Sequence, residues 1–168
     1  SGLGVNVEEV AIGSYQVLEH TATANEAIVI TDSPNVSIIP AHIDLVAIEI
    51  ELVDKQEREY MLKKALKNIK DNFDYIVIDC APSLGLITLN ALVASDAVII
   101  PIQCEYFALE GLGKLLNTIK SVQNLHNPDL DIEGLLLTMF DSRLRLSNQV
   151  VDEVRKHFSS MVFDTIIR

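Results

Sequence analysis

Three short polar segments follow apolar runs in this 168-residue chain, and they are where chemistry would be expected. In an open parallel sheet, ligands bind outside the carboxyl ends of the strands, so the residues just past each apolar run are the candidates. The three segments are 79–83 (Asp-Cys-Ala-Pro-Ser), 101–105 (Pro-Ile-Gln-Cys-Glu) and 138–143 (Thr-Met-Phe-Asp-Ser-Arg).

Asp79 is the strongest of these candidates. It ends the run Tyr75-Ile-Val-Ile, whose β-branched, apolar character predicts a strand over 75–79 with helices on both faces. A carboxylate taken out of water beside such a run is costly unless something compensates it. A magnesium ion, reached directly or through a water molecule and shared with nucleotide phosphates, would do so. An aspartate that caps the following turn through backbone N–H groups is the other explanation, and the residues alone leave both open.

Other catalytic chemistries have little support. Cys80 and Cys104 are the only cysteines, and neither belongs to a Cys-x-x-Cys motif. Ser83 lacks the Gly-x-Ser-x-Gly elbow of a nucleophile and is expected to cap a turn or a helix. The chain also has no Gly-x-x-x-x-Gly-Lys-Ser/Thr loop to cradle phosphates. A zinc site is not expected, because no two histidines stand four residues apart; they are His20, His42, His126 and His157.

Charge is distributed unevenly along the chain. The net charge of −11 argues against indiscriminate binding to nucleic acid or anionic lipid. From Arg143 to the end, however, five basic residues outnumber three acidic ones. A weakly basic end on an acidic body is a hint of polarity in partner binding.

Strands and helices alternate in units of about 25 to 35 residues, which calls for a parallel sheet with right-handed crossovers. The predicted fold class is α/β, a doubly wound and mostly parallel sheet with helices on both faces. Short helices are possible at 14–20 and 24–28. Predicted strands are 36–40, 75–79, 97–102, 132–140 and 162–167, and predicted helices are one or two within 44–70, then 86–94, 109–123 and 147–158, the last capped by Ser147.

The composition fits one intracellular domain. Hydrophobic residues make up 49% of the chain but aromatic residues only 5%, so an aliphatic core over residues 1–168 is expected. No linker or internal repeat divides the chain. There is no apolar run long enough to span a membrane and no signal-like start, so a cytoplasmic protein is expected.

Two blocks of the chain closely resemble the ParA/Soj family of chromosome and plasmid partitioning ATPases. They are residues 73–92 (Phe-Asp-Tyr-Ile-Val-Ile-Asp-Cys-Ala-Pro-Ser-Leu-Gly-Leu-Ile-Thr-Leu-Asn-Ala-Leu) and 95–112 (Ser-Asp-Ala-Val-Ile-Ile-Pro-Ile-Gln-Cys-Glu-Tyr-Phe-Ala-Leu-Glu-Gly-Leu). The likeness extends to Ser1-Gly-Leu-Gly4, to Ile38-Ile-Pro-Ala and to the stretch from Leu135 to Lys156, and so covers essentially the whole chain.

The resemblance implies a deviant Walker ATPase of the P-loop NTPase fold. Such a protein forms a homodimer around two ATP molecules with Mg²⁺, binds DNA non-specifically as the dimer, and is stimulated by a ParB/Spo0J-type partner. A cytoplasmic, nucleoid-associated protein without membrane attachment is implied. Asp79 would be the Walker B residue on the magnesium side. The implied DNA-binding residues, which could equally be a solvated helix face, are Arg143, Arg145, Arg155 and Lys156.

The chain departs from the family where the phosphates would bind. The family begins with Lys-Gly-Gly-Val-Gly-Lys-Thr-Thr and an aspartate-bearing switch segment, and neither is present. We therefore expect an internal piece that lacks the first strand and the P-loop, binds no ATP or Mg²⁺ by itself, and cannot hydrolyse ATP at a useful rate. Exposed sheet edges and self-association are also expected. The alternative is a non-catalytic interaction or dimerisation module on the same fold.

Overall fold

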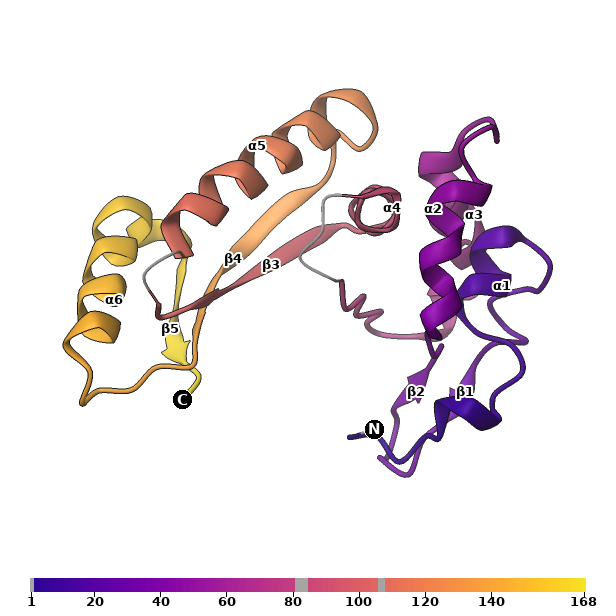
Figure 1. The fold of residues 1–168 in the computed structure, drawn as a ribbon, viewed down its shortest axis with the longest axis horizontal. Helices are drawn as coiled ribbons and strands as arrows, with labels where there is room; N and C mark the ends of the chain where they lie inside the picture. Colours follow the sequence, from indigo (N-terminus) through magenta and orange to yellow (C-terminus); the bar gives the residue numbers. More distant parts are fainter. Residues whose placement is uncertain (1, 81–84, 106–107) are drawn as a thin grey trace. The chain divides into compact units, whose positions relative to one another are not determined.

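The computed structural model describes residues 2–80, 85–105 and 108–168, and for 108–110 only the backbone. The chain divides into two compact units, Ser1–Ala94 and Ser95–Arg168, and each is described by itself (Figure 1).

Most of the regular elements in the described part of the first unit are short helices. Its one described sheet is a short antiparallel pair, β1 (Val29–Ile30) with β2 (Ser37–Ile38). Its described residues also form α-helices α1 (Ser14–Glu19), α2 (Ile48–Glu51), α3 (Met61–Leu66) and α4 (Leu86–Ala94). Short stretches of 3₁₀-helix lie between them and before α1: η1 (Val7–Glu9), η2 (Ile43–Ala47), η3 (Arg58–Tyr60) and η4 (Lys70–Asn72).

Two small aliphatic clusters lie among the described residues of this unit. One gathers Val17, Ala24, Ala27 and Ile69, and the other gathers Leu18, Ile48, Leu52 and Met61. Because Val17 and Leu18 are neighbours on α1, this helix contributes to both clusters and joins them.

A buried asparagine fixes α4 to the rest of the unit. Asn90 is 1% exposed, and its Nδ2 donates to the carbonyl oxygens of Arg58 at 2.8 Å and Leu86 at 3.1 Å. Its Oδ1 accepts a hydrogen bond from the Leu62 backbone N–H at 3.0 Å. The side chain therefore supplies partners for backbone groups at the junction of η3 and α3, where regular helical bonding is interrupted.

Replacing Asn90 with alanine should destabilise the first unit by about 2 kcal/mol, since partly buried backbone groups lose their partners. Urea unfolding followed by circular dichroism would measure the change in midpoint. The matched control is Asn68→Ala, because Asn68 is exposed in the same unit. Equal midpoints for the two variants would show that the Asn90 hydrogen bonds contribute no net stability.

The second unit is built on a parallel sheet with strand order β3-β4-β5. The strands are β3 (Ala97–Gln103), β4 (Asp131–Thr138) and β5 (Val162–Ile166), joined by α5 (Ala108–Leu125) and α6 (Arg145–Phe158) with η5 (Ser159–Met161). Figure 1 shows α5 lying along β3 and β4. This is the alternation of parallel strands and crossover helices that the sequence predicted.

Amphipathic patterns explain how the second unit packs. Alternate residues of β3 are buried, with Ile100 3% and Ile102 4% exposed, whereas Ile99 is 53% exposed. Leu112 and Ile119 of α5 are buried at a spacing of seven residues, as expected for one helix face. A second buried asparagine, Asn127, donates from Nδ2 to the Ser95 carbonyl at 2.8 Å and so ties the end of α5 to the start of β3.

The predicted strand 75–79 does not form. This segment belongs to no helix or strand, and Tyr75 and Val77 are 89% and 90% exposed. β-branched residues favour a strand, but a strand also needs a neighbour to complete its hydrogen-bonded ladder. Among the described residues β3 pairs only with β4, and no partner is aligned with 75–79.

Smaller differences have local causes. The helical stretch predicted within 44–70 is interrupted by turns over 52–57 and by η3, and 24–27 forms a turn in place of a helix. The predicted strand 36–40 shortens to β2. Ser147 does not cap α6, which begins two residues earlier after Leu144; its hydroxyl instead donates to the Cys104 carbonyl at 3.2 Å. No helix in the described part of the chain is long and apolar enough to cross a membrane.

Candidate functional site

The carboxyl ends of β3 and β4 lie side by side in the second unit. Gln103 is in register with Thr138, and the Cys104 N–H donates to the Thr138 carbonyl at 3.1 Å. Two of the three polar segments predicted to carry chemistry, 101–105 and 138–143, therefore meet at one edge of the sheet. We call this edge, residues 103–105 and 138–141, the sheet rim.

The rim contains a backbone outlier that sequence patterns did not reveal. Met139 has φ 54°, a left-handed conformation that residues with side chains rarely adopt, and it is 59% exposed. The next residue is held in place, because the Phe140 N–H donates to the Ile167 carbonyl at 3.2 Å. A glycine or asparagine would have signalled this turn; a methionine gives no such signal.

Asp79 lies at the end of the irregular segment that follows η4, in the first unit. Its side chain is exposed, so the predicted burial of its carboxylate beside a strand is not seen. Residues 81–84, which include Ser83, lie outside the described residues. An exposed carboxylate is free of the desolvation cost that the sequence argument assumed.

The thiol of Cys80, next to Asp79 in the sequence, has a raised pKa. Desolvation of the Cys80 sulfur, and secondly the negative charge of Asp79, raise the pKa of Cys80 above its ordinary value. Because a raised pKa disfavours the thiolate, Cys80 is protonated at neutral pH and is a poor nucleophile. Burial likewise raises the pKa of Cys104, which is 2% exposed.

The four basic candidates are all exposed, but they form two groups at opposite ends of α6. Arg143 and Arg145 lie at its start, and Arg155 and Lys156 lie in its last turn. Eleven residues from Arg145 to Lys156 correspond to about 16 Å along the helix axis. The buried face of α6 carries Ser147, Val150, Val151 and Val154.

Helix electrostatics distinguish the two groups. Cations in the last turn of a helix interact favourably with its dipole, so Arg155 and Lys156 have a structural explanation. Arg145 lies in the first turn, where a positive charge interacts unfavourably with the helix dipole, so the dipole does not explain this residue. The local electrostatics therefore give Arg145 no stabilising role.

Arg143 is held by an acidic neighbour. Its Nη2 donates to Asp141 Oδ2 at 2.7 Å and its Nε to Oδ1 at 3.0 Å. These bonds lower the pKa of Asp141. The ion pair is therefore fully formed at pH values above the ordinary carboxyl pKa, and it is lost as the pH falls through the lowered pKa of Asp141. At neutral pH the Arg143 charge is partly neutralised.

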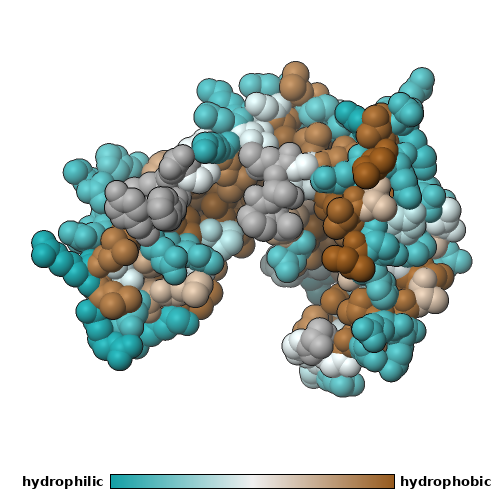
Figure 2. All heavy atoms as spheres, viewed as in Figure 1, coloured by the Kyte–Doolittle hydropathy of each residue, from teal (hydrophilic) through white to brown (hydrophobic). Residues whose placement is uncertain are grey.

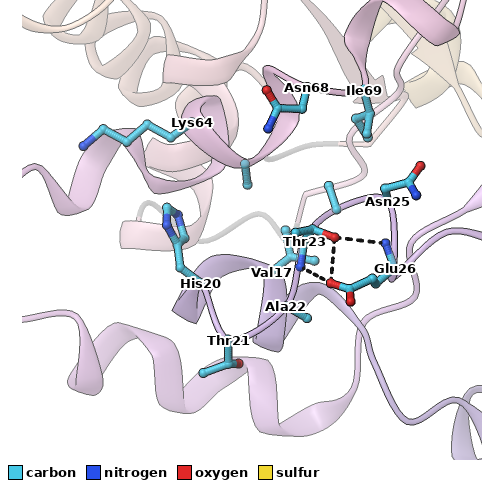
Figure 3. Close-up of a pocket in the computed structure, with 12 residues that line it drawn as sticks. Val17, His20, Thr21, Ala22, Thr23, Asn25, Glu26, Lys64, Asn68 and Ile69 are labelled. Atoms are coloured by element: carbon cyan, nitrogen blue, oxygen red, sulfur yellow. Dashed lines mark hydrogen bonds between the residues drawn. The ribbon is translucent and has the colours of Figure 1, made fainter.

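A pocket of about 370 Å³ lies in the first unit, next to the ends of α1 and α3 (Figure 3). Three of its polar side chains, Glu26, Lys64 and His20, already have partners within the protein. Glu26 accepts hydrogen bonds from the Thr23 hydroxyl at 2.7 Å and the Thr23 N–H at 2.9 Å, and these bonds lower the pKa of Glu26. Lys64 pairs with Glu57 at 2.7 Å, and His20 Nε2 bonds the Met61 carbonyl at 3.2 Å. Because these three side chains are already paired within the protein, we assign no site to the pocket.

Magnesium chemistry requires few protein ligands. Mg²⁺ is often bound by one or two carboxylates together with nucleotide phosphates and water, rather than by a full protein cage. Among the described residues no three His, Cys, Asp or Glu side chains gather as a metal site. The exposed carboxylate of Asp79 fits the role of a single protein ligand, with phosphates and water as the other ligands.

Comparison with known proteins gives a consistent result. A family model described as an AAA domain matches residues 1–132. The Bacillus subtilis protein named "Sporulation initiation inhibitor protein Soj" is 52% identical over 99% of this chain and 66% of its own length. The Myxococcus xanthus "Chromosome partitioning protein ParA" is 47% identical over 99% of this chain and 59% of its own length. The chain thus spans 59–66% of the length of these curated relatives.

Solved structures agree on the fold. A Mycobacterium smegmatis protein described as cobyrinic acid a,c-diamide synthase, crystallised with ADP and magnesium, is similar at a TM-score of 0.87 and 40% identity. The match covers 94% of this chain and 64% of that one. A plasmid partition protein from Borrelia burgdorferi matches with a TM-score of 0.75 and 30% identity, over 92% of this chain and 62% of that one.

Proposed function

Because this chain belongs to the ParA/Soj family of partitioning ATPases, we propose that it is part of a protein that segregates chromosomes or plasmids. The observation that carries the proposal is 52% identity to Soj over 99% of the chain. In the whole protein, ATP would drive formation of a homodimer that binds DNA non-specifically, and a ParB/Spo0J-type partner would regulate it. We place it in the cytoplasm, on the nucleoid.

Nucleotide would bind with magnesium, as ADP and magnesium do in the M. smegmatis protein. When bound, Mg²⁺ would neutralise phosphate charge that develops during hydrolysis. Asp79 would hold the ion, either directly or through a water molecule. In this proposal residues 1–168 belong to one ATPase domain, and the segment 75–79 supplies its Walker B residue.

The DNA contacts would be electrostatic and independent of sequence. Arg143, Arg145, Arg155 and Lys156 are exposed and lie on or next to a single helix. Arginine and lysine contacts to phosphates release bound counterions, so the affinity would fall steeply with salt. The two groups at the ends of α6 could contact phosphates about 16 Å apart.

The 168-residue chain alone would not hydrolyse ATP. It contains no Gly-x-x-x-x-Gly-Lys-Ser/Thr motif, and this motif supplies the N–H groups and the lysine that bind the β- and γ-phosphates. We therefore propose that this chain by itself binds no ATP or Mg²⁺. The alternative function is a non-catalytic interaction or dimerisation module on the same fold.

Calorimetric titration with Mg·ATP separates the two functions. The N-terminal segment of B. subtilis Soj, fused ahead of Ser1, should restore nucleotide binding at micromolar concentration, while the 168-residue chain gives no heat of binding. The control is the same fusion with the lysine of its phosphate loop changed to alanine. A fusion that folds but binds no nucleotide would favour the interaction module.

A further inference from the structure

The carboxylate of Glu49, on α2, lies against Gly85, the residue that precedes α4. A Cβ atom built on Gly85 would collide with this carboxylate, whose carbon atom would be only 2.8 Å away. Cβ atoms in proteins essentially never come so close to another heavy atom. The Glu49 carboxylate therefore occupies the space that a side chain at position 85 would need, and glycine allows this close approach.

The hydrophobic core of the first unit brings the two residues together. Ile48, next to Glu49, is fully buried in one of the two aliphatic clusters. Leu86, next to Gly85, packs against the same cluster. The approach of Glu49 to Gly85 therefore follows from the packing of α2 against α4.

The polarity of α2 is reversed at Glu49. Glu49 is only partly exposed, whereas its neighbour Ile50 is 78% exposed. Figure 2 shows that hydrophobic side chains do reach the surface of the first unit. A surface helix normally turns its charged residues to water and its apolar residues inward. A carboxylate that faces the protein beside an exposed isoleucine indicates that the charge has a partner, and the start of α4 is that partner.

Gly85 stands at the N-cap position of α4. Its carbonyl oxygen accepts the first helical hydrogen bond, from the Leu89 N–H at 3.0 Å. An N-cap side chain usually supplies an oxygen atom to the free N–H groups of the first turn, and glycine has none. The first turn of α4 also carries no acidic residue. Glu49 brings a negative charge to this end of the helix from another element, and such a charge interacts favourably with the helix dipole.

The start of α4 is also one end of the segment that carries Asp79. Gly85 follows Asp79 by six residues. Residues 75–79 belong to no helix or strand of the described structure, so no ladder of backbone hydrogen bonds fixes them there. Their placement depends on the elements at the two ends, η4 and α4. Asn90 holds the middle of α4, and Glu49 holds its start.

From these contacts we propose that Glu49 is a positioning residue for Asp79. Its carboxylate fixes the first turn of α4, and the fixed turn limits the positions that the Asp79 carboxylate can adopt. The inference rests on the proposed function, in which Asp79 holds a magnesium ion. Residues behind a metal ligand orient it, and their loss typically weakens metal affinity or activity by 10- to 100-fold. Glu49 acts through α4 and needs no contact with the nucleotide.

Hydrogen exchange tests the first half of the proposal on the 168-residue chain, without nucleotide. Glu49→Gln keeps the shape of the side chain and removes its charge. The Leu89 amide should then exchange about fivefold faster, as expected when a helix loses one capping interaction. The control is Asp54→Asn, which removes an exposed carboxylate from the same unit and should leave the rate unchanged. An unchanged Leu89 rate in Glu49→Gln would overturn the proposal.

A double-mutant cycle tests the close approach itself. Gly85→Ala should lower the urea midpoint of unfolding, because the added methyl group meets the Glu49 carboxylate. In a Glu49→Ala background the methyl group has room, so the same substitution should lower the midpoint less than about half as much. Gly2→Ala is the control, because no atom lies within 4 Å of a Cβ at that position. Equal losses in the two backgrounds would contradict the contact.

The magnesium dependence of ATP hydrolysis tests the link to Asp79. In the fusion that carries the Soj segment, Glu49→Gln should raise the Mg²⁺ concentration for half-maximal hydrolysis about tenfold. Glu49→Asp, which keeps the charge, should have a smaller effect. A merely structural role would lower the amount of active protein and leave this concentration unchanged.

Two outcomes separate this inference from the proposed function. If Asp79→Ala abolishes hydrolysis by the fusion but Glu49→Gln leaves its magnesium dependence unchanged, the positioning role is wrong and the proposed function stands. If the folded fusion binds no nucleotide, the proposed function is wrong, and the positioning role is wrong with it.

Discussion

Replacing Asp79 with alanine is expected to lower ATP hydrolysis at least about 100-fold in a chain that carries the family's phosphate-binding loop. If the carboxylate positions the magnesium ion, its loss removes charge stabilisation of the phosphoryl group during transfer. The measurement is phosphate release at saturating Mg·ATP by the Soj-segment fusion described above.

Two controls make this result specific. Asp74→Ala removes a carboxylate from the same exposed stretch and should leave the rate unchanged. The 168-residue chain without the fused segment should release no phosphate above background. Undiminished hydrolysis by the Asp79→Ala fusion would show that this residue caps a turn and has no part in the reaction.

The second large effect concerns DNA binding. Arg143→Ala with Arg145→Ala should weaken binding of the ATP-loaded fusion to a random duplex by about tenfold or more at low salt. Two phosphate contacts would be lost, so the slope of log affinity against log salt should fall by about 2. Filter binding across a salt series measures both quantities.

Charge changes at other positions refine this prediction. Lys120→Ala removes an exposed charge from α5 and serves as the control. Asp141→Asn should strengthen binding, because it frees Arg143 from the ion pair that partly neutralises it. Arg155→Ala with Lys156→Ala should have a smaller effect than the first pair if these residues chiefly stabilise the end of α6. An unchanged salt slope in the Arg143/Arg145 variant would remove these residues from the DNA interface.

Both predictions depend on residues whose surroundings differ from those expected. Asp79 was expected at the buried end of a strand, and it is exposed on an irregular segment. The four basic residues were predicted as DNA contacts, and the structure places them in two groups, one near each end of α6.

The family and the strand–helix alternation of the second unit could both be predicted from the residues alone. The helix predicted at 86–94 is α4, and the predicted strands near 97–102, 132–140 and 162–167 are β3, β4 and β5 within one or two residues at each end. These elements could be predicted because periods of two and 3.6 residues are local properties, readable without knowledge of the neighbours. The family follows from long blocks of matching residues.

Which segments pair and which side chains are buried depends on contacts between distant parts of the chain. The segment 75–79 belongs to no described sheet, and Met139 adopts a left-handed backbone conformation. Asn90 is buried, and its side chain forms hydrogen bonds with backbone groups of η3 and α3. Ile48 and Leu52 are buried while Ile43 and Ile50, on the same segment, are not. The physical reason is that ladder hydrogen bonds and burial depend on residues far away in the sequence, whereas the local pattern specifies only which faces are apolar.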